Sequence, residues 1–145
     1  MTEKEGVETL YRRVLGGILR KVRHSQAMSD TEIYPIGLEL LGSKFIGVYA
    51  RGEIDTNIQR PYGTCYILNT TARKSKGEHW LAIWHDSNNQ PILFDSFARD
   101  HILPDFQGRK TDRDIDQEDW QNSCGQRCLA FLCVAAMKGE SCLWI

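Results

Sequence analysis

The stretch SCGQRCLAFLCVAAM, residues 123–137, decides how the rest of the sequence is interpreted. Its apolar side chains fall on several sides of a helix, and they include Leu129, Phe131, Leu132, Val134 and Ala135. A helix that is apolar nearly all round is buried on all sides. We therefore expect a central helix from about Cys124 to Met137, with the other elements packed around it.

Short β-like runs precede this helix, at Phe45–Ala50, Cys65–Asn69, His79–Trp84 and Ile92–Phe97. Their composition and spacing are typical of strands. The polar tract 86–91 joins the last two runs with turn-forming residues, which predicts a hairpin. Residues 99–119 are polar and carry a block of charges over 109–119, so we expect a surface loop there.

The N-terminal part is expected to be helical. An apolar stripe at three- and four-residue spacing is typical of an amphipathic helix, and it comprises Val7, Leu10, Tyr11, Val14, Leu15, Ile18, Leu19 and Val22. The opposite face is basic, which suits an anionic partner such as DNA or, more simply, a solvated surface. A second helix is expected to be capped by Asp30 or Thr31, broken by Pro35 and ended near Gly42.

Helices over residues 1–42, strands over 43–97 and a final helix over 123–137 favour an α+β fold over a parallel α/β one. The 145 residues fit one domain spanning 1–145, and 41% of them are apolar, which is enough for a core. A formal net charge of −1 and a pI near 6.4 give no reason to expect nucleic acid or an anionic membrane as partner.

The sequence gives no indication of a membrane span, a secretory signal or a disulfide framework. No apolar run is long enough for a membrane span, and the first ten residues, MTEKEGVETL, lack the pattern of a secretory signal. The five cysteines are an odd number, and their spacing does not resemble a disulfide framework. We therefore expect a reducing, intracellular compartment.

Cys124 is the candidate nucleophile. Asn122 or Ser123 is a good N-cap, which would place Cys124 in the first turn of the last helix. Free N–H groups and the positive end of the helix dipole favour a thiolate there, and Gly125 permits close approach of backbone or substrate. Cys128 and Cys133, inside the apolar helix, are expected only to pack.

His79 and Asp95 are the candidate partners of Cys124. Asp95 lies between aromatic residues sixteen positions after His79, where a carboxylate is costly unless it is paired. If their strands are neighbours, Asp95 accepts the Nδ1 proton of His79, and Nε2 faces the nucleophile. The alternatives are a structural histidine and an aspartate bonded only to backbone amides. The other histidines, His24, His85 and His101, are expected at the surface.

An enzyme of this kind also needs donors for a developing oxyanion. The backbone N–H of Cys124 is one. A side-chain amide is the other. Gln117 is preferred over Gln121, which lies too close to the helix entrance to reach back across the nucleophile. The alternative is that both are ordinary solvent-exposed loop glutamines. Trp80 is assigned to the wall of a substrate cleft, with a plain core tryptophan as the alternative.

The order of these motifs resembles the adenovirus-type viral maturation proteases, whose clan includes SUMO- and ubiquitin-like deconjugating peptidases. Residues 77–83, GEHWLAI, resemble the family's G-x-H-W strand, and residues 93–97, LFDSF, its F-[DE]-x-F segment. Residues 124–128, CGQRC, resemble its Cys-Gly nucleophile turn, and Gln117 falls where its oxyanion glutamine would. Residues 45–48 and 67–70 resemble the short versions found in virophages, so the resemblance spans about residues 45–135.

The resemblance implies a papain-like cysteine protease fold, with a mixed or antiparallel sheet packed against a buried nucleophile helix. It implies an endopeptidase that cuts viral capsid precursors during maturation, in the virion and the host-cell interior. We expect a monomer without metal, cofactor or membrane. The stretch between Asp95 and Cys124 is shorter than in the adenovirus enzymes, and nothing in this near-neutral chain indicates their activating peptide or DNA.

Two other functions stay open at this point. The same chemistry could remove a ubiquitin-like modifier, whose C-terminal tail would need a narrow tunnel. A non-enzymatic module could bind metal through Cys124, Cys128 and a histidine. The C-x3-C spacing within one helix is poor for zinc, and no second pair completes such a site.

Overall fold

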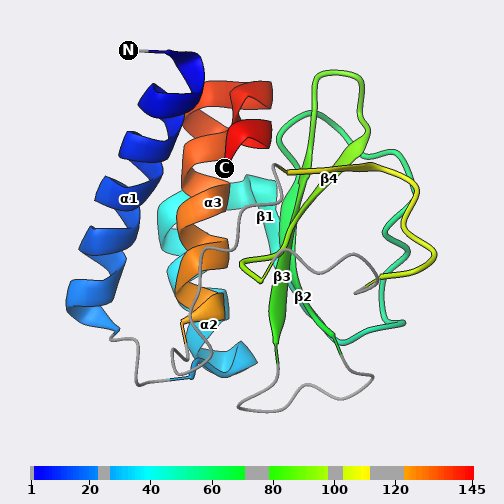
Figure 1. The fold of residues 1–145 in the computed structure, drawn as a ribbon. Helices are drawn as coiled ribbons and strands as arrows, with labels where there is room; N and C mark the ends of the chain where they lie inside the picture. Colours follow the sequence, from blue (N-terminus) through cyan, green and yellow to red (C-terminus); the bar gives the residue numbers. More distant parts are fainter. Residues whose placement is uncertain (1, 23–26, 71–78, 98–102, 112–122) are drawn as a thin grey trace.

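The computed structural model of the chain describes residues 2–22, 27–70, 79–97, 103–111 and 123–145 (Figure 1). These ranges contain the helices α1 (Glu3–Lys21), α2 (Asp30–Leu41) and α3 (Cys124–Lys138). They also contain the strands β1 (Phe45–Tyr49), β2 (Cys65–Asn69), β3 (Trp80–His85), β4 (Pro91–Phe94) and β5 (Arg109–Lys110). Short 3-10 segments, Gly42–Lys44 and Gly139–Trp144, follow α2 and α3, and the second is called η2. The predicted α+β class is confirmed.

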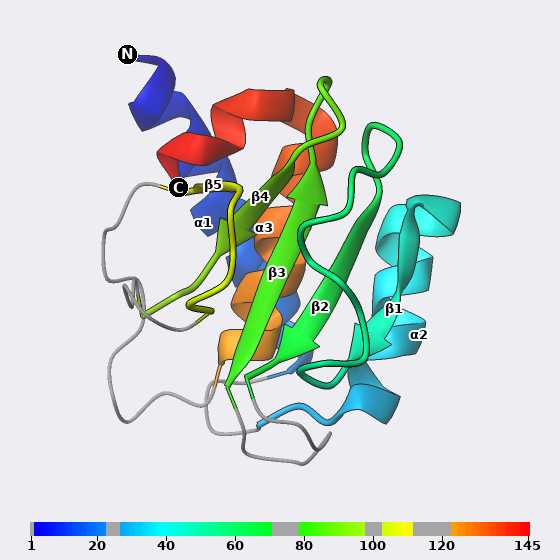
Figure 2. The ribbon, with the colours of Figure 1, turned by 90° about the vertical axis from the view of Figure 1, so that its right-hand side faces the viewer.

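The strands form one mixed sheet in the order β1-β2-β3-β4-β5. The pairs β2–β3 and β3–β4 are antiparallel, whereas β1–β2 and β4–β5 are parallel. Ile83 of β3 lies opposite Leu93 of β4, which confirms the predicted hairpin. Seen face-on, the chain between β1 and β2 crosses the face of the sheet that points away from the helices (Figure 2).

Both faces of the sheet are buried along its inner strands, β2, β3 and β4. Trp80, Ala82 and Trp84 belong to the core between the sheet and the helices. Leu81 and Ile83 belong to a second, smaller cluster beneath the loops of the other face. Every residue of β3 is therefore buried, which explains why its sequence is apolar from Trp80 to Trp84 rather than alternating.

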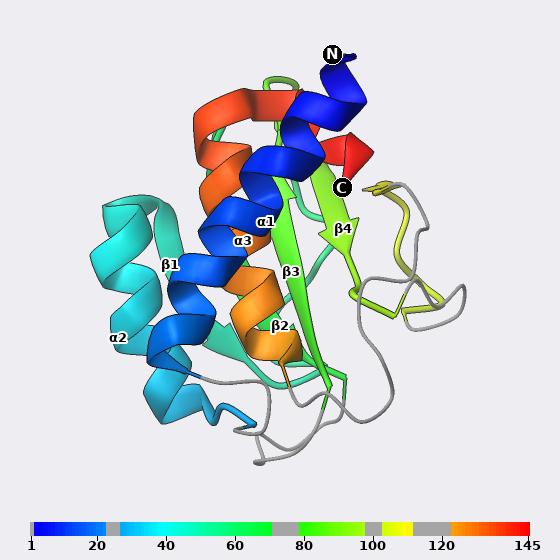
Figure 3. The ribbon, with the colours of Figure 1, turned by 60° about the vertical axis from the view of Figure 1, so that its left-hand side comes forward.

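Helix α3 is the central element that the sequence predicts. Its residues from Cys128 to Leu132 are 0% exposed. Phe131 stacks on Phe94 of β4, with ring centroids 4.7 Å apart and planes 5° apart. Helix α1 runs alongside α3 on the side away from the sheet (Figure 3). The ring of Tyr11 from α1 packs edge to face with the ring of Phe94, and their centroids are 6.0 Å apart.

The second helix corrects two expectations. Its N-cap is Ser29, in a capping box with Glu32, rather than Asp30 or Thr31. The helix also continues through Pro35 to Leu41. A proline in the second turn removes one backbone hydrogen bond, but Ile33 and Gly37 on the same helix are buried against the core and hold it in place.

The predicted surface loop 99–119 contains a short strand that the sequence does not indicate. Arg109 and Lys110 pair with Ile92 and Leu93 as β5. Two charged residues carry no apolar pattern, so only the tertiary contact reveals them as a strand. Among the helices that the structure describes, none has both the length and the apolar character that crossing a membrane requires.

Candidate active site

Cys124 is the first residue of α3, and 9% of it is exposed. Its Sγ lies 3.4 Å from the backbone nitrogen of Trp80, which donates a hydrogen bond to it. Because Trp80 begins β3, the first turn of α3 and the start of the central strand meet at this sulfur. The helix N-terminus and the Trp80 N–H are both favourable neighbours for a negatively charged sulfur.

His79 and Asp95 lie at the same end of the sheet. His79 directly precedes β3 and Asp95 directly follows β4. Since these strands are antiparallel neighbours, the beginning of one lies beside the end of the other. The two side chains form a hydrogen-bonded pair, and their side-chain exposures are 8% and 5%.

The orientation of the imidazole differs from the expected one. Asp95 Oδ1 bonds to Nε2 of His79, whereas a bond to Nδ1 was expected. With Nε2 occupied by the carboxylate, Nδ1 is the ring nitrogen that remains for Cys124. The order of residues along the chain does not determine this choice, because it depends on how the ring is turned as the backbone enters β3.

The pKa of His79 reflects opposing influences. Burial by itself lowers the pKa of the imidazole. The hydrogen bond with Asp95 and the interaction with the Cys124 side chain outweigh burial and raise the pKa from 6.5 to about 9. The imidazole therefore remains protonated at neutral pH, hydrogen-bonded to the Asp95 carboxylate and electrostatically coupled to the Cys124 thiol.

Phe97 completes the support of this pair, a role that was not predicted from the sequence. Its ring lies 4.9 Å from the His79 ring, centroid to centroid. Its backbone N–H donates to Asp95 Oδ1 at 3.0 Å. The feature of the sequence that could have indicated this role is an aromatic residue two positions after Asp95. Phe97 thus contacts both members of the pair and limits how far either can turn.

The structure places Trp80 in the core rather than on a cleft wall. The residue is 1% exposed, and its indole Nε1 donates to the carbonyl oxygen of Met28 at 2.8 Å. Gly125 is packed just as closely, since an added Cβ would lie 3.2 Å from Cβ of Met28. The close approach at Gly125 is therefore to the segment that leads into α2.

The other predicted positions have different outcomes. Gln117, Gln121, His24 and His101 lie outside the described residues. His85 is not a surface residue, because it is 0% exposed and its Nδ1 bonds to the carbonyl oxygen of Asn89 at 3.1 Å. The described residues contain no group of three or more His, Cys, Asp or Glu side chains arranged to hold a metal ion.

The remaining cysteines differ from Cys124 in their surroundings. Burial raises the pKa of Cys65 and of Cys142 to about 12, and that of Cys133 to about 11. Cys128 is fully buried, and its pKa lies well above the ordinary value for the same reason. These thiols therefore remain protonated at neutral pH.

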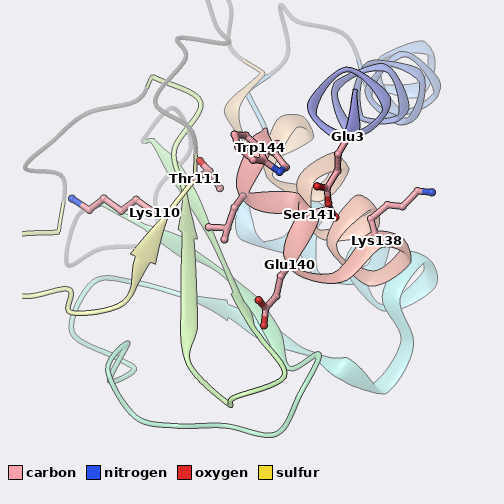
Figure 4. A pocket seen from close by; sticks show the side chains of 8 residues that line it. Glu3, Lys110, Thr111, Lys138, Glu140, Ser141 and Trp144 are labelled. Carbon is pink, nitrogen blue, oxygen red and sulfur yellow. Dashed lines mark hydrogen bonds between the residues drawn. The ribbon is translucent and has the colours of Figure 1, made fainter. Parts of the chain in front are cut away.

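An open cavity of about 710 Å³ lies at the C-terminal end of α3, and Lys138 and Glu140 form part of the cavity wall (Figure 4). Glu3 and Trp144 also line it, from α1 and η2. At 1.5 Å per residue, the length of α3 separates this cavity from Cys124 by about 20 Å. The described residues that line it include no cysteine or histidine, so it is a feature distinct from the Cys124 site.

No family model, curated protein or solved structure matches the chain.

Proposed function

We propose that the protein is a cysteine endopeptidase in which Cys124 is the nucleophile, His79 its proton-transfer partner and Asp95 the group that orients His79. One observation carries the proposal. A buried imidazole interacts with both a carboxylate and a thiol, and that thiol belongs to the first residue of a helix. A cysteine that serves only packing needs neither partner.

The proposed reaction begins with a thiolate–imidazolium pair. A His79 pKa of about 9 means that the proton resides on the imidazole at neutral pH. The Cys124 thiolate attacks a peptide carbonyl carbon, and the carbonyl oxygen becomes an oxyanion. His79 then donates its proton to the leaving amine nitrogen as the C–N bond breaks. Water gives a proton to His79 as its oxygen attacks the thioester carbonyl carbon. The C–S bond then breaks, which releases the carboxylic acid product and restores the thiolate–imidazolium pair.

The oxyanion needs hydrogen-bond donors near Cys124. The backbone N–H of Cys124 stands at the N-terminus of α3, where the helix dipole also favours negative charge. We propose that Gln117 supplies a second donor from its side chain, with Gln121 as the alternative. Trp80 supports the thiolate through its backbone N–H rather than through its indole.

The proposed substrate class rests on the resemblance of the motifs to adenovirus-type maturation proteases. The proposed fold is the papain-like one of that family, for which the mixed sheet and the buried α3 provide compatible elements. The proposed substrates are viral capsid precursors, cut in the virion or inside the host cell. A polypeptide substrate requires no cofactor in this mechanism.

The first test follows the alkylation of each cysteine by iodoacetamide against pH, in the native protein and in His79→Ala. We expect Cys124 to react fastest at pH 7, and we expect His79→Ala to slow it by at least about tenfold, because the proton acceptor is lost. Peptide mapping by mass spectrometry gives the rate at each cysteine. The four other cysteines are internal controls, since their raised pKa values predict slow reaction in both variants.

A Cys124 that reacts no faster than the other four, and is indifferent to His79→Ala, contradicts the proposal. A circular dichroism melting curve of His79→Ala shows that any change in rate is not caused by unfolding.

A second test addresses the substrate. The protein is incubated with capsid precursor polypeptides and with a panel of ubiquitin-like modifiers joined to a fluorophore, each with Cys124→Ala as the control. We expect Cys124-dependent cleavage of precursors within the chain and no release of the fluorophore. Rapid turnover of one modifier conjugate would assign the same site to deconjugation instead.

A further inference from the structure

Arg127 is a buried cation in an unfavourable place. It lies three residues after Cys124 in α3, and only 4% of it is exposed. Arginine is rarely buried to this extent without partners, because desolvation of its charge is costly. The N-terminal turn of a helix also disfavours positive charge. Such a residue requires a structural reason, and its contacts supply one.

Arg127 holds Ser123 at two points. The side-chain Nε donates to Ser123 Oγ at 2.9 Å. The backbone N–H of Arg127 donates to the carbonyl oxygen of Ser123, also at 2.9 Å. Ser123 is 0% exposed, so both bonds lie in a protected environment where geometry is well defined. Ser123 is the residue that directly precedes the candidate nucleophile.

The backbone of Ser123 is not that of the other N-caps. Thr2 and Ser29 have extended conformations, with ψ of 164° and 167°, and both take part in capping boxes. Ser123 has φ −109° and ψ 20°, and its hydroxyl makes no capping bond. The hydroxyl that would ordinarily serve as a cap is the acceptor for Arg127 instead.

The ψ angle of Ser123 determines where the next N–H points. Rotation about this bond turns the whole Ser123–Cys124 peptide plane, because that plane is rigid. The N–H of Cys124 is part of the plane, and it is the backbone donor of the proposed oxyanion site. A side chain that fixes Ser123 therefore fixes the direction of this donor.

We propose that Arg127 is a positioning residue that acts through Ser123 to aim the Cys124 N–H at the oxyanion. The inference rests on the proposed function and deepens it. Arg127 contributes to attack on a carbonyl, where an oxyanion forms, rather than to the nucleophilicity of the thiol. Two reactions of the same sulfur separate these contributions.

Iodoacetamide reacts at a saturated carbon. The thiolate forms a C–S bond, iodide leaves and no oxyanion appears. With p-nitrophenyl acetate the thiolate attacks the carbonyl carbon, an oxyanion forms, and p-nitrophenolate leaves as the acetyl thioester is made. The ratio of the acetylation rate to the alkylation rate therefore measures the oxyanion site, with the thiol itself as the reference.

The experiment measures both rates at Cys124 in the wild-type chain, Ser123→Ala, Arg127→Gln and the double variant. We expect each single variant to lower acetylation by at least about tenfold, with alkylation within about twofold of wild type. Because both changes break one contact, the double variant should acetylate no more slowly than the worse single variant. Gln126→Leu is the matched control. It removes another buried polar side chain of the same turn, bonded to the carbonyl oxygen of Val22, and should keep the wild-type ratio.

Equal losses of both rates, or an unchanged ratio in Ser123→Ala, would overturn the role of Arg127. Ser123→Ala removes only one oxygen atom, so it tests the role of the Arg127–Ser123 contact even if Arg127→Gln does not fold. Failure of the proposed function looks different, because wild-type Cys124 would then alkylate no faster than the other cysteines and would not depend on His79. In that case the inference fails together with its premise.

Discussion

His79 is a residue whose charge is determined by two side chains rather than by its exposure. Burial alone would make it neutral, and a neutral buried histidine is the ordinary outcome, as at His85, where burial lowers the pKa. The Asp95 carboxylate and the Cys124 side chain reverse this effect at His79. The amino-acid composition does not reveal why the pKa shifts of these two histidines have opposite directions. The reason is their place in the fold, because His79 precedes β3 and His85 is its last residue.

The pH dependence of stability tests the His79–Asp95 pair. The comparison is between the variant Cys124→Ser and the double variant Cys124→Ser with His79→Gln, so that the two chains differ only at residue 79. The folded pKa of His79 in the native chain, about 9, is above its ordinary 6.5. The stabilisation by the imidazolium is therefore complete below pH 6.5 and disappears as the pH rises through the folded pKa.

We expect the imidazole-containing variant to lose about 1–2 kcal/mol of its advantage between pH 6 and pH 10. Urea unfolding at several pH values measures the difference. An advantage that stays constant, or grows with pH, would show that Asp95 does not hold the proton on His79.

At the scale of elements, helix α2 owes its position to a missing side chain. Glycine in a helix interior is unfavourable by about 1 kcal/mol relative to alanine. At Gly37 the absence of a Cβ allows contact with Phe45 of β1, because an added Cβ would lie 2.4 Å from the Cε2 atom of that ring. Gly16 in α1 has nothing within 4 Å of the corresponding point.

The two glycines therefore predict opposite results. Gly37→Ala should destabilise the protein by about 1–3 kcal/mol, because the clash exceeds the gain in helix propensity. Gly16→Ala should stabilise it by about 0.5–1 kcal/mol. Chemical denaturation of both variants measures the effect. A stabilised Gly37→Ala variant would mean that α2 does not pack on β1 as described.

The sequence predicted those elements whose pattern is long or strongly apolar. The runs that became β1, β2, β3 and β4, and the helix α3, follow from apolar composition, since each is buried on one or more faces. It did not predict β5, which contains two charged residues, or the continuity of α2 through Pro35. Burial of Arg127 and His85 also escaped prediction, because polar residues are buried only when tertiary partners receive them.

At the scale of the whole molecule, one ionic network joins parts of the chain that are distant in sequence. Arg109 of β5 bonds to Asp86 of the β3–β4 turn, with 2.5 Å between the guanidinium nitrogen and Oδ2. Its guanidinium also lies 3.4 Å from Glu140 of η2, which accepts a hydrogen bond from Ser87 at 2.9 Å. The hairpin, the edge strand and the C-terminal segment are thereby tied together.

Arg109→Ala should destabilise the protein by about 1–3 kcal/mol, since the Asp86 side chain is 1% exposed and would lose its cation. Because the Arg109 side chain is about half exposed, this expected loss of stability is at the lower end of the range for ion pairs with a buried partner. Hydrogen exchange should become faster in η2 and in the turn 86–90. Lys4→Ala, which breaks the exposed pair with Glu8 at 4.0 Å, is the control and should change stability by less than about 0.5 kcal/mol. Equal effects of the two variants would contradict the network.

Trp80 has a consequence for how this protein can be observed. Its backbone N–H contacts the Cys124 sulfur, while its indole N–H is bound to Met28 at the entrance to α2. The sulfur of Cys124 is therefore connected through Trp80 both to β3 and to the segment that leads into α2. The rate at which a small electrophile alkylates Cys124 therefore also reports on tertiary packing. We expect this rate to change when α2 loosens, before the far-ultraviolet circular dichroism of the helices changes.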